Sequence, residues 1–398
     1  MPRFEPFRAL RYASGTSLEA VLAPPYDVLS ADDARALAAQ DPHNVVHVDV
    51  PLVVHASARD PYEAAAAVLR RWVAIGVLVR DADPAFTIHR MRFVDDTGTP
   101  RETVGVLGAL EVVDEGAGGV LPHERTTPKA STDRLDLTRA TRANLSPVWG
   151  LALVRGLTDA LADPGEPVGT ATLDGVTHLV ERLTDADRVA AVSALVGSDD
   201  VLVADGHHRY AVARAFRDEV RAGPDGGPAA GAEVTLAYVG ELTADQLAIA
   251  AIHRVYRGIG FPALRSALAR SFVLSPAPQP APGLVAEMVD RGALVLLGPG
   301  GSSEWLTPRP GAFPDVRALD GAYLEHALVG TTVEVGYQHG VLDAAHAVAS
   351  GAVTAAVLIR PTSVAEVLRT AREGLLMPPK STFFTPKPPT GLVIREIG

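Results

Sequence analysis

The chain has 398 residues, of which 47% are hydrophobic and 21% charged, so it is long and apolar enough for two or three folded domains. Its net charge of −11 argues against a general nucleic-acid coat or a polybasic membrane surface. The absence of cysteine excludes disulfides, thiolate zinc sites, iron–sulfur clusters and a cysteine nucleophile.

The N-terminal sequence MPRFEPFRALRY lacks the apolar core of a signal peptide, and no later run approaches about 18 apolar residues. We therefore expect a cytoplasmic protein with no membrane partner. Ser30 predicts the N-cap of a first helix, and Asp60-Pro61-Tyr62 opens a second helix that runs to about Gly76. Residues 86–94 and 103–113 are expected to be strands on either side of a hairpin turn.

Residues 116–150 are rich in charged and polar side chains and are hard to assign to a core. The tripeptide His123-Glu124-Arg125 can provide a carboxylate base steered by neighbouring cations. A solvated surface turn would have the same composition. Arg139 and Arg142 are three residues apart and share a helix face, which either lines an anion pocket or pairs with nearby aspartates in solvent.

The segment 201–213, VLVADGHHRYAVA, is the most informative part of the chain. Its apolar run predicts a buried strand, Asp205-Gly206 predicts a sharp turn, and a helix is expected from His208 onward. A helix N-terminus directs backbone N–H groups and the positive end of its dipole at one point, which forms an anion pocket. His207, His208 and Arg209 surround that point, and a guanidinium suits phosphate oxygens. The segment predicts either a phosphate-binding loop or a polar turn without a ligand.

His207 and His208 are also candidate metal ligands. Adjacent residues on a regular element rarely face one ion, and the histidines and carboxylates nearby lack the spacing of a zinc enzyme. We therefore favour phosphate binding over a transition-metal site.

The remaining elements lie on both sides of a proline-rich linker at 275–283. The strands expected are at 168–183 (a pair), 234–242, 249–256, 293–297 and 355–358. The helices expected are at 185–195, 319–328, 343–350 and 363–373, followed by an extended tail that ends at 391–394. His339, His346 and Lys380 are interpreted as local hydrogen-bonding or surface residues.

Six segments, in one order along nearly the whole chain, resemble the bacterial family called domain of unknown function 1015. They are APPYDV at 23–28, LPHERT at 121–126, TRANLSP at 141–147, ADGHHRYAVA at 204–213, His253-Arg254, and MPPKSTFFTPK at 377–387. That family in turn resembles the ParB/sulfiredoxin-like superfamily, in which a Gly-x-x-Arg turn holds nucleotide phosphates at a helix N-terminus. Sulfiredoxin chemistry requires a cysteine and is excluded, and the acidic composition disfavours DNA partitioning, so no nucleic-acid partner is expected.

Within that superfamily, the free-serine kinases carry a similar Asp-Gly-His-His-Arg turn and a His-Glu motif whose glutamate acts as the base. The resemblance implies catalytic roles for Glu124, Asp205 and His207, with Mg²⁺ or the acceptor held by Asp205. The phosphate-binding residues that it implies, together with adjacent cations, are Gly206, His208, Arg209, His123, Arg125 and Arg142. The chain departs from a minimal serine kinase in its longer flanking regions and in the separation of about 80 residues between the two motifs.

The resemblance and the element pattern together predict an α+β fold with mixed sheets. We expect an N-terminal α+β region at 1–115, a ParB/sulfiredoxin-like nucleotide-binding core at 116–260, and a C-terminal α/β region with an extended tail at 261–398. The expected function is a kinase that uses Mg²⁺ and ATP or ADP to phosphorylate the hydroxyl of free serine or a related small molecule. Two alternatives stay open: a nucleotide-binding regulatory module without transfer chemistry, and a phosphate-ester hydrolase.

Overall fold

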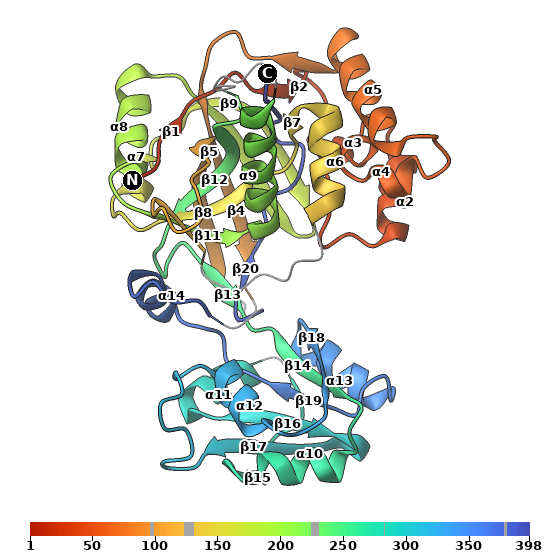
Figure 1. Ribbon diagram of the computed structural model, residues 1–398, viewed down its shortest axis with the longest axis vertical. Helices are drawn as coiled ribbons and strands as arrows, with labels where there is room; N and C mark the ends of the chain where they lie inside the picture. Colours follow the sequence, from red (N-terminus) through yellow and green to blue (C-terminus); the bar gives the residue numbers. More distant parts are fainter. Residues whose placement is uncertain (96–98, 123–130, 224–230, 282, 378–379) are drawn as a thin grey trace. The chain divides into compact units, whose positions relative to one another are not determined.

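The computed structural model describes residues 1–95, 99–122, 131–223, 231–281, 283–377 and 380–398 (Figure 1). The chain divides into two compact units. Unit 1 comprises Met1–Phe93, Pro100–Leu247 and Pro386–Gly398, and unit 2 comprises Val94–Thr99 and Ala248–Thr385. Unit 2 is therefore inserted in the sequence between the main part of unit 1 and the C-terminal tail of unit 1.

In the described part of the chain, unit 1 is built around a mixed sheet of nine strands in the order β6-β11-β8-β12-β5-β4-β10-β9, with β1 beside β5. Strand β11 is parallel to β6 and antiparallel to β8, and β12 is parallel to β8. The strands of unit 1 are β1 (Phe4–Glu5), β2 (Leu10–Tyr12), β3 (Leu78–Arg80), β4 (Phe86–Val94), β5 (Pro100–Glu111), β6 (Val120–Pro122), β7 (Ala143–Asn144), β8 (Val148–Ala152), β9 (Glu166–Leu173), β10 (Val176–Leu183), β11 (Val201–Asp205), β12 (Val234–Glu241) and β21 (Arg395–Glu396).

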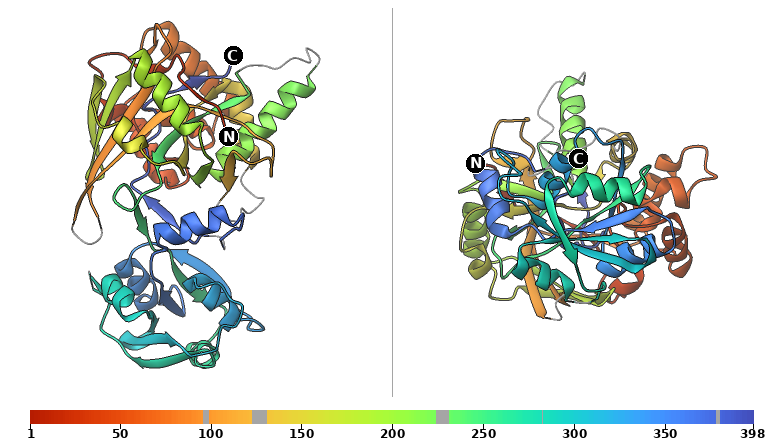
Figure 2. Two further views of the ribbon diagram at one scale, coloured as in Figure 1. Left: turned by 90° about the vertical axis from the view of Figure 1, so that its left-hand side faces the viewer. Right: turned by 90° about the horizontal axis from the view of Figure 1, so that it is seen from below.

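Helices flank this sheet, and α5, α6 and α9 pack in succession against one another (Figures 1 and 2). The helices of unit 1 are α1 (Leu18–Val21), α2 (Ala31–Gln40), α3 (Val46–Asp49), α4 (Pro51–Val54), α5 (Pro61–Ala74), α6 (Ser131–Thr141), α7 (Leu157–Ala160), α8 (Ala186–Val196) and α9 (His207–Ala222). The helix starts predicted from sequence are confirmed: Ser30 and Asp33 form a reciprocal capping box, and Asp60 accepts hydrogen bonds from the first turn of α5. Apolar residues of β4, β5, β11 and β12 form the core between the sheet and its helices.

The C-terminal tail is an integral part of unit 1. Thr390 donates its backbone N–H to the carbonyl of Ala23 at 2.8 Å, and Ile394 donates to the carbonyl of Leu10 at 2.9 Å. Strand β21 then pairs with β7. Both Thr390 and Ile394 are fully buried, so the tail is fixed within the core rather than lying loosely on the surface.

Unit 2 has its own antiparallel sheet, in the order β15-β17-β16-β19-β14-β18, and its own apolar core on both faces. Its elements are β13 (Ala248–Ala250), β14 (His253–Arg257), α10 (Phe261–Leu268), β15 (Phe272–Pro276), α11 (Leu284–Arg291), β16 (Leu294–Gly298), a 3₁₀ turn (Pro299–Gly301), β17 (Ser302–Pro308), α12 (Asp320–Ala327), β18 (Glu334–Gln338), α13 (Val341–Ala349), β19 (Ala355–Leu358), α14 (Val364–Arg372) and β20 (Phe383–Thr385). No helix in the described residues is long and apolar enough to cross a membrane.

The predicted α+β class with mixed sheets is confirmed. The two units divide the chain differently from the three regions expected from sequence. Strand β5 pairs with β12, so the regions 1–115 and 116–260 share one sheet. Strand β14 is expected within the nucleotide-binding core at 116–260, but it pairs with β18 and β19 of unit 2. Strand pairing between distant segments, and not the local sequence pattern, defines these units.

Candidate functional site

The turn Asp205-Gly206 follows β11 directly and leads into α9. Residues 201–204 of β11 are buried, as their apolar pattern predicts. Gly206 has φ 84° and ψ 28°, a left-handed conformation that L residues adopt at a cost. A Cβ atom at this position would lie 2.9 Å from Nε and 3.0 Å from Cζ of Arg209. Glycine is therefore required here both for the backbone conformation and for the guanidinium that packs against it.

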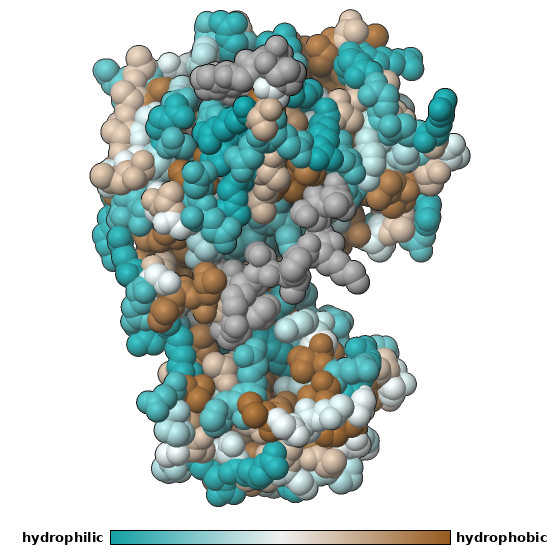
Figure 3. Space-filling view, viewed as in Figure 1, coloured by the Kyte–Doolittle hydropathy of each residue, from teal (hydrophilic) through white to brown (hydrophobic). Residues whose placement is uncertain are grey.

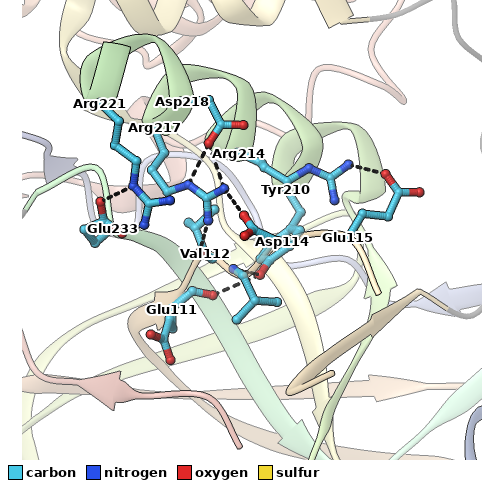
Figure 4. A network of polar contacts seen from close by, with 11 residues as sticks. Glu111, Val112, Asp114, Glu115, Tyr210, Arg214, Arg217, Asp218, Arg221 and Glu233 are labelled. Carbon is cyan, nitrogen blue, oxygen red and sulfur yellow. Dashed lines mark hydrogen bonds and ion pairs between the residues drawn. The ribbon is translucent and has the colours of Figure 1, made fainter. Parts of the chain in front are cut away.

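The direction of α9 is fixed by polar contacts along one side of the helix (Figure 4). The Tyr210 hydroxyl accepts from the N–H of Val113 at 2.8 Å and donates to the carbonyl of Glu111 at 3.0 Å. Arg217 is 2% exposed and donates to the carbonyl of Val112. Two ion pairs continue this network, Arg214–Glu115 and Arg221–Glu233. These contacts tie α9 to the end of β5 and thereby hold its N-terminal turn in place.

The outward surface of α9 is charged. Asp218, Glu219 and Arg221 are exposed, and the surface over this helix is mainly hydrophilic (Figure 3). Arg139 of α6 pairs with Asp136 and with Glu219, which agrees with the interpretation of this arginine as part of a solvated face.

A cluster of charged side chains surrounds the turn at the start of α9. We call it the charged cluster, and its members are Asp27, Asp49, Arg134, Asp205, Arg209 and Lys387. Arg209 donates to a carboxylate oxygen of Asp205 and to the carbonyl of Pro147. The Nζ atom of Lys387 donates to Asp205 Oδ1 at 2.9 Å and to Asp27 Oδ2 at 2.8 Å. Asp205 is thus held by two cations, one on each oxygen.

Arg134 forms the other side of the charged cluster. Its NH1 group donates to the carbonyl of Asp49 at 2.7 Å and to Asp49 Oδ1 at 3.1 Å, and the Arg134 side chain also pairs with Asp133. The guanidinium lies 4.2 Å from the centroid of the Tyr26 ring, a cation–π geometry. Arg134 therefore connects α6, the end of α3 and the segment 23–28.

Burial and charge act against each other at this cluster. Burial raises the pKa of Asp205, but the charges of Arg209 and Lys387 outweigh it and hold that pKa at about 2. Burial lowers the pKa of Arg209, and the negative charge of Asp205 outweighs this, so the pKa is raised. Burial raises the pKa of Asp49, with Arg134 and Arg209 opposing. Asp205 and Arg209 are consequently charged together at neutral pH.

A small pocket lies behind the turn, between α6 and α9. Its polar end is lined by Asp49, Arg134 and Arg209, and Val212 and Phe216 of α9 line its apolar side. The pocket encloses about 50 Å³, which is room for one or two water molecules and too little for a nucleotide. This pocket is therefore not a nucleotide-binding cavity.

The structure keeps most of the described candidate residues together and separates one of them. Asp205, Gly206, His207, His208 and Arg209 form the turn and the first turn of α9. The two histidines are half-buried, and the charge of His207 contributes to lowering the pKa of Asp205.

Arg142 lies beyond the C-terminal end of α6, whereas Arg134 is in its first turn. Its NH2 group donates to Gly398 at 2.6 Å, and its guanidinium lies 5.1 Å from the ring centroid of Phe216. With these partners, Arg142 anchors the C-terminus and is not part of the charged cluster.

The candidates His123, Glu124 and Arg125 lie outside the described residues. The strand before them, β6, ends at Pro122, which is in register with Val203 of the parallel strand β11. The chain thus leaves β6 at the same edge of the sheet as the Asp205-Gly206 turn.

The predicted metal role of Asp205 does not fit the arrangement of its partners. Both carboxylate oxygens already accept hydrogen bonds from cations, Oδ1 from Lys387 and Oδ2 from Arg209. Mg²⁺ requires close oxygen ligands in near-octahedral geometry, so an ion at Asp205 would have to displace one of these cations. Among the residues that the structure describes, no three His, Cys, Asp or Glu side chains are placed to hold a metal ion.

The sequence interpretation missed four members of the cluster as site residues, namely Asp27, Asp49, Arg134 and Lys387. Asp27 and Lys387 lie in the motif segments 23–28 and 377–387, so the motifs contained the signal although no role was assigned within them. Asp49 lies in no such motif, and its pairing with Arg134 follows from the packing of α3 near α6.

The amino-acid sequence of the chain that carries this site matches a known protein family. Residues 4–322 match the family described as protein of unknown function (DUF1015). The chain belongs to this family. Among curated proteins, the comparison finds no significant match. The further relation to the ParB/sulfiredoxin-like superfamily stays a prediction.

Several solved structures are similar to this DUF1015 chain at low identity. A free serine kinase in complex with AMP is 16% identical, with 69% of this chain and 89% of that chain covered and a TM-score of 0.37. SbnI from Staphylococcus aureus, truncated at its C-terminus, is 14% identical, with 73% and 87% covered and a TM-score of 0.40. A conserved hypothetical protein from Pyrococcus furiosus is 13% identical, with 70% and 92% covered and a TM-score of 0.39.

Proposed function

We propose that this protein is a nucleotide-dependent kinase that transfers a phosphoryl group to the hydroxyl of free serine or a related small molecule. The observation that carries the proposal is the N-terminus of α9. A left-handed glycine ends the strand β11, Gly206 provides no capping side chain, and Arg209 lies over the turn. An uncapped helix N-terminus beside cationic side chains is an arrangement suited to phosphate groups.

Positioning and charge neutralisation are the main requirements of phosphoryl transfer. We assign phosphate binding to the backbone of Gly206 and to His207, His208 and Arg209. Asp205 fixes the guanidinium of Arg209 through their ion pair, beside the proposed phosphate position. The sequence resemblance of Asp205–Arg209 to the Asp-Gly-His-His-Arg turn of free-serine kinases supports the same assignment.

Glu124 is the proposed base. The acceptor oxygen forms a bond to the terminal phosphorus as the bond from that phosphorus to the bridging oxygen of the nucleotide breaks, and Glu124 takes the hydroxyl proton. The strand register supports this role, because Glu124 and Asp205 each follow the registered pair Pro122 and Val203 by two residues. Strand β6 ends at the edge of the sheet at which the Asp205-Gly206 turn also lies.

The proposal is tested by incubating the protein with Mg²⁺, ATP or ADP, and L-serine, and by measuring O-phosphoserine by mass spectrometry. We expect product with the natural chain and at least a ~100-fold loss in Glu124→Ala, as for removal of a general base. Glu63→Ala is the matched control, because Glu63 is an exposed glutamate of α5 that pairs with Arg70 outside the charged cluster and outside the contacts that hold α9. This control should retain full turnover.

The other outcomes discriminate among the functions considered. Nucleotide binding that depends on Arg209 but gives no transfer with any hydroxyl compound would contradict a kinase and favour a regulatory module. Release of inorganic phosphate without phosphoserine would favour a hydrolase. The absence of nucleotide binding would contradict the phosphate-binding role of the α9 N-terminus itself.

A further inference from the structure

The C-terminal tail brings a lysine into the charged cluster. Lys387 is two residues beyond the boundary of unit 2 and three residues before Thr390, whose backbone pairs with Ala23 in the core of unit 1. Its side chain is 11% exposed, and its ammonium group bridges Asp27 and Asp205 at 2.8 and 2.9 Å. The tail thereby connects two carboxylates that are 178 residues apart in sequence (205 − 27).

The choice of a lysine at this position is informative. Only Lys129, Lys380 and Lys387 are lysines among the 36 basic residues of the chain, so arginine is its usual cation. An ammonium group is a compact point charge with donors in several directions, whereas a guanidinium is a wide planar fork. Two carboxylate oxygens that converge on one compact cation are also the environment in which a divalent ion binds.

We propose that Lys387 is the resident cation of the phosphate site, and that its ammonium group holds the place between Asp27 and Asp205 that a divalent ion would otherwise take. This inference rests on the proposed function, because the proposed function places a phosphate group next to Lys387. The ammonium group bridges the two carboxylates when no nucleotide is bound, and together with Arg209 it balances their charge. It is a second cation beside Arg209 for the phosphates of a bound nucleotide. Lys387 is a positioning residue for Asp205 and a phosphate ligand.

The first measurement is Mn²⁺ binding to the full chain without nucleotide. The electron paramagnetic resonance signal of free Mn²⁺ reports how much of the ion is bound. The natural chain should show no binding that depends on Asp27. Lys387→Met should gain at least ~10-fold in Mn²⁺ affinity, because the change removes the cation between Asp27 Oδ2 and Asp205 Oδ1 and leaves Arg209 as the cation paired with Asp205. The double variant Asp27→Asn/Lys387→Met should lose that gain in Mn²⁺ affinity. Because it lacks the carboxylate of Asp27, it also serves as the folded reference.

Lys380→Met is the matched control, because Lys380 is an exposed lysine of the segment 377–387 outside the charged cluster. It should leave Mn²⁺ binding unchanged. Mn²⁺ binding by the natural chain that Asp27→Asn abolishes would overturn the proposal, and so would a folded Lys387→Met variant without any gain.

The second measurement is the affinity for ADP without metal, by calorimetry. Lys387→Met should weaken ADP binding at least ~10-fold relative to Lys380→Met, because a charge-assisted contact is lost. Unchanged ADP affinity in Lys387→Met would overturn its role as a phosphate ligand. If the natural chain binds no ADP, the proposed function fails, while the Mn²⁺ measurement still decides whether Lys387 is the resident cation.

Discussion

Replacement of Gly206 by alanine perturbs the proposed phosphate turn at a single atom. The residue has φ 84°, and the new Cβ would meet Arg209 Nε at 2.9 Å and Cζ at 3.0 Å. Real Cβ atoms do not approach neighbours so closely, so the guanidinium must move away from the turn. That movement weakens the contacts of Arg209 with Asp205 and with the carbonyl of Pro147.

The expected magnitude has two parts. An alanine in the left-handed region costs about 1–2 kcal/mol. Displacement of a buried guanidinium from a carboxylate and a carbonyl costs about 1.5–3 kcal/mol more, the range for hydrogen bonds to charged groups. We therefore expect Gly206→Ala to lower the free energy of unfolding of unit 1 by about 2.5–5 kcal/mol and to weaken nucleotide binding as well.

Gly175 provides the matched control. It has a similar φ of 78°, in the turn between β9 and β10, but a Cβ there would meet nothing within 4 Å. Gly175→Ala should therefore show only the backbone cost of about 1–2 kcal/mol. The difference between the two variants isolates the effect on Arg209.

The measurement is urea unfolding followed by tryptophan fluorescence. A Trp305→Phe background removes the tryptophan of unit 2, and the remaining two of the three tryptophans, Trp72 and Trp149, both belong to unit 1. Equal destabilisation by Gly206→Ala and Gly175→Ala would refute the argument that Arg209 packs on the glycine and supports the turn.

Three further predictions concern stability. Arg217→Met should destabilise unit 1 by about 1–3 kcal/mol in urea unfolding, because the carbonyl of Val112 loses its buried donor; an effect below 0.5 kcal/mol would contradict this. The pKa of Asp205 is about 2 in the folded state, below the unfolded value of 3.8. The stability advantage of the natural chain over Asp205→Asn, measured by unfolding at each pH, should therefore be constant above about pH 5. It should shrink by about 2 kcal/mol as the pH falls from 4 to 2. Burial lowers the pKa of His178 from 6.5 to about 4. The stability that neutral His178 contributes is therefore complete above pH 6.5 and is lost as the pH falls towards 4. His178→Gln should remove about 3 kcal/mol of the pH dependence of stability between these values, and an unchanged stability profile would argue against the lowered pKa.

Local sequence signals predicted much of the fold. The Ser30 cap, the strand pair at 168–183 and the strand at 355–358 agree with the structure, because caps, turns and alternating patterns act over a few neighbouring residues. The segment 201–213 likewise folds as strand, turn and helix, although α9 begins one residue earlier than expected.

The division into units was not available from such signals. The proline-rich linker at 275–283 suggested a boundary, yet it lies within unit 2, and the boundaries fall at Leu247 and Pro386. Strand pairing between distant segments defines them, as in the pairing of β5 with β12. Local composition carries little information about such partners.

The sequence by itself determined the central chemistry of the candidate site: a glycine that tolerates a left-handed turn, followed by two histidines and an arginine at a helix N-terminus. Only the tertiary structure decided which charges meet there. Lys387 reaches Asp27 across 360 residues and Asp205 across 182, and Arg134 reaches Asp49 across 85. A backbone turn is set by the conformational limits of its own residues, whereas an ion pair depends on the folded path of every segment between its two partners.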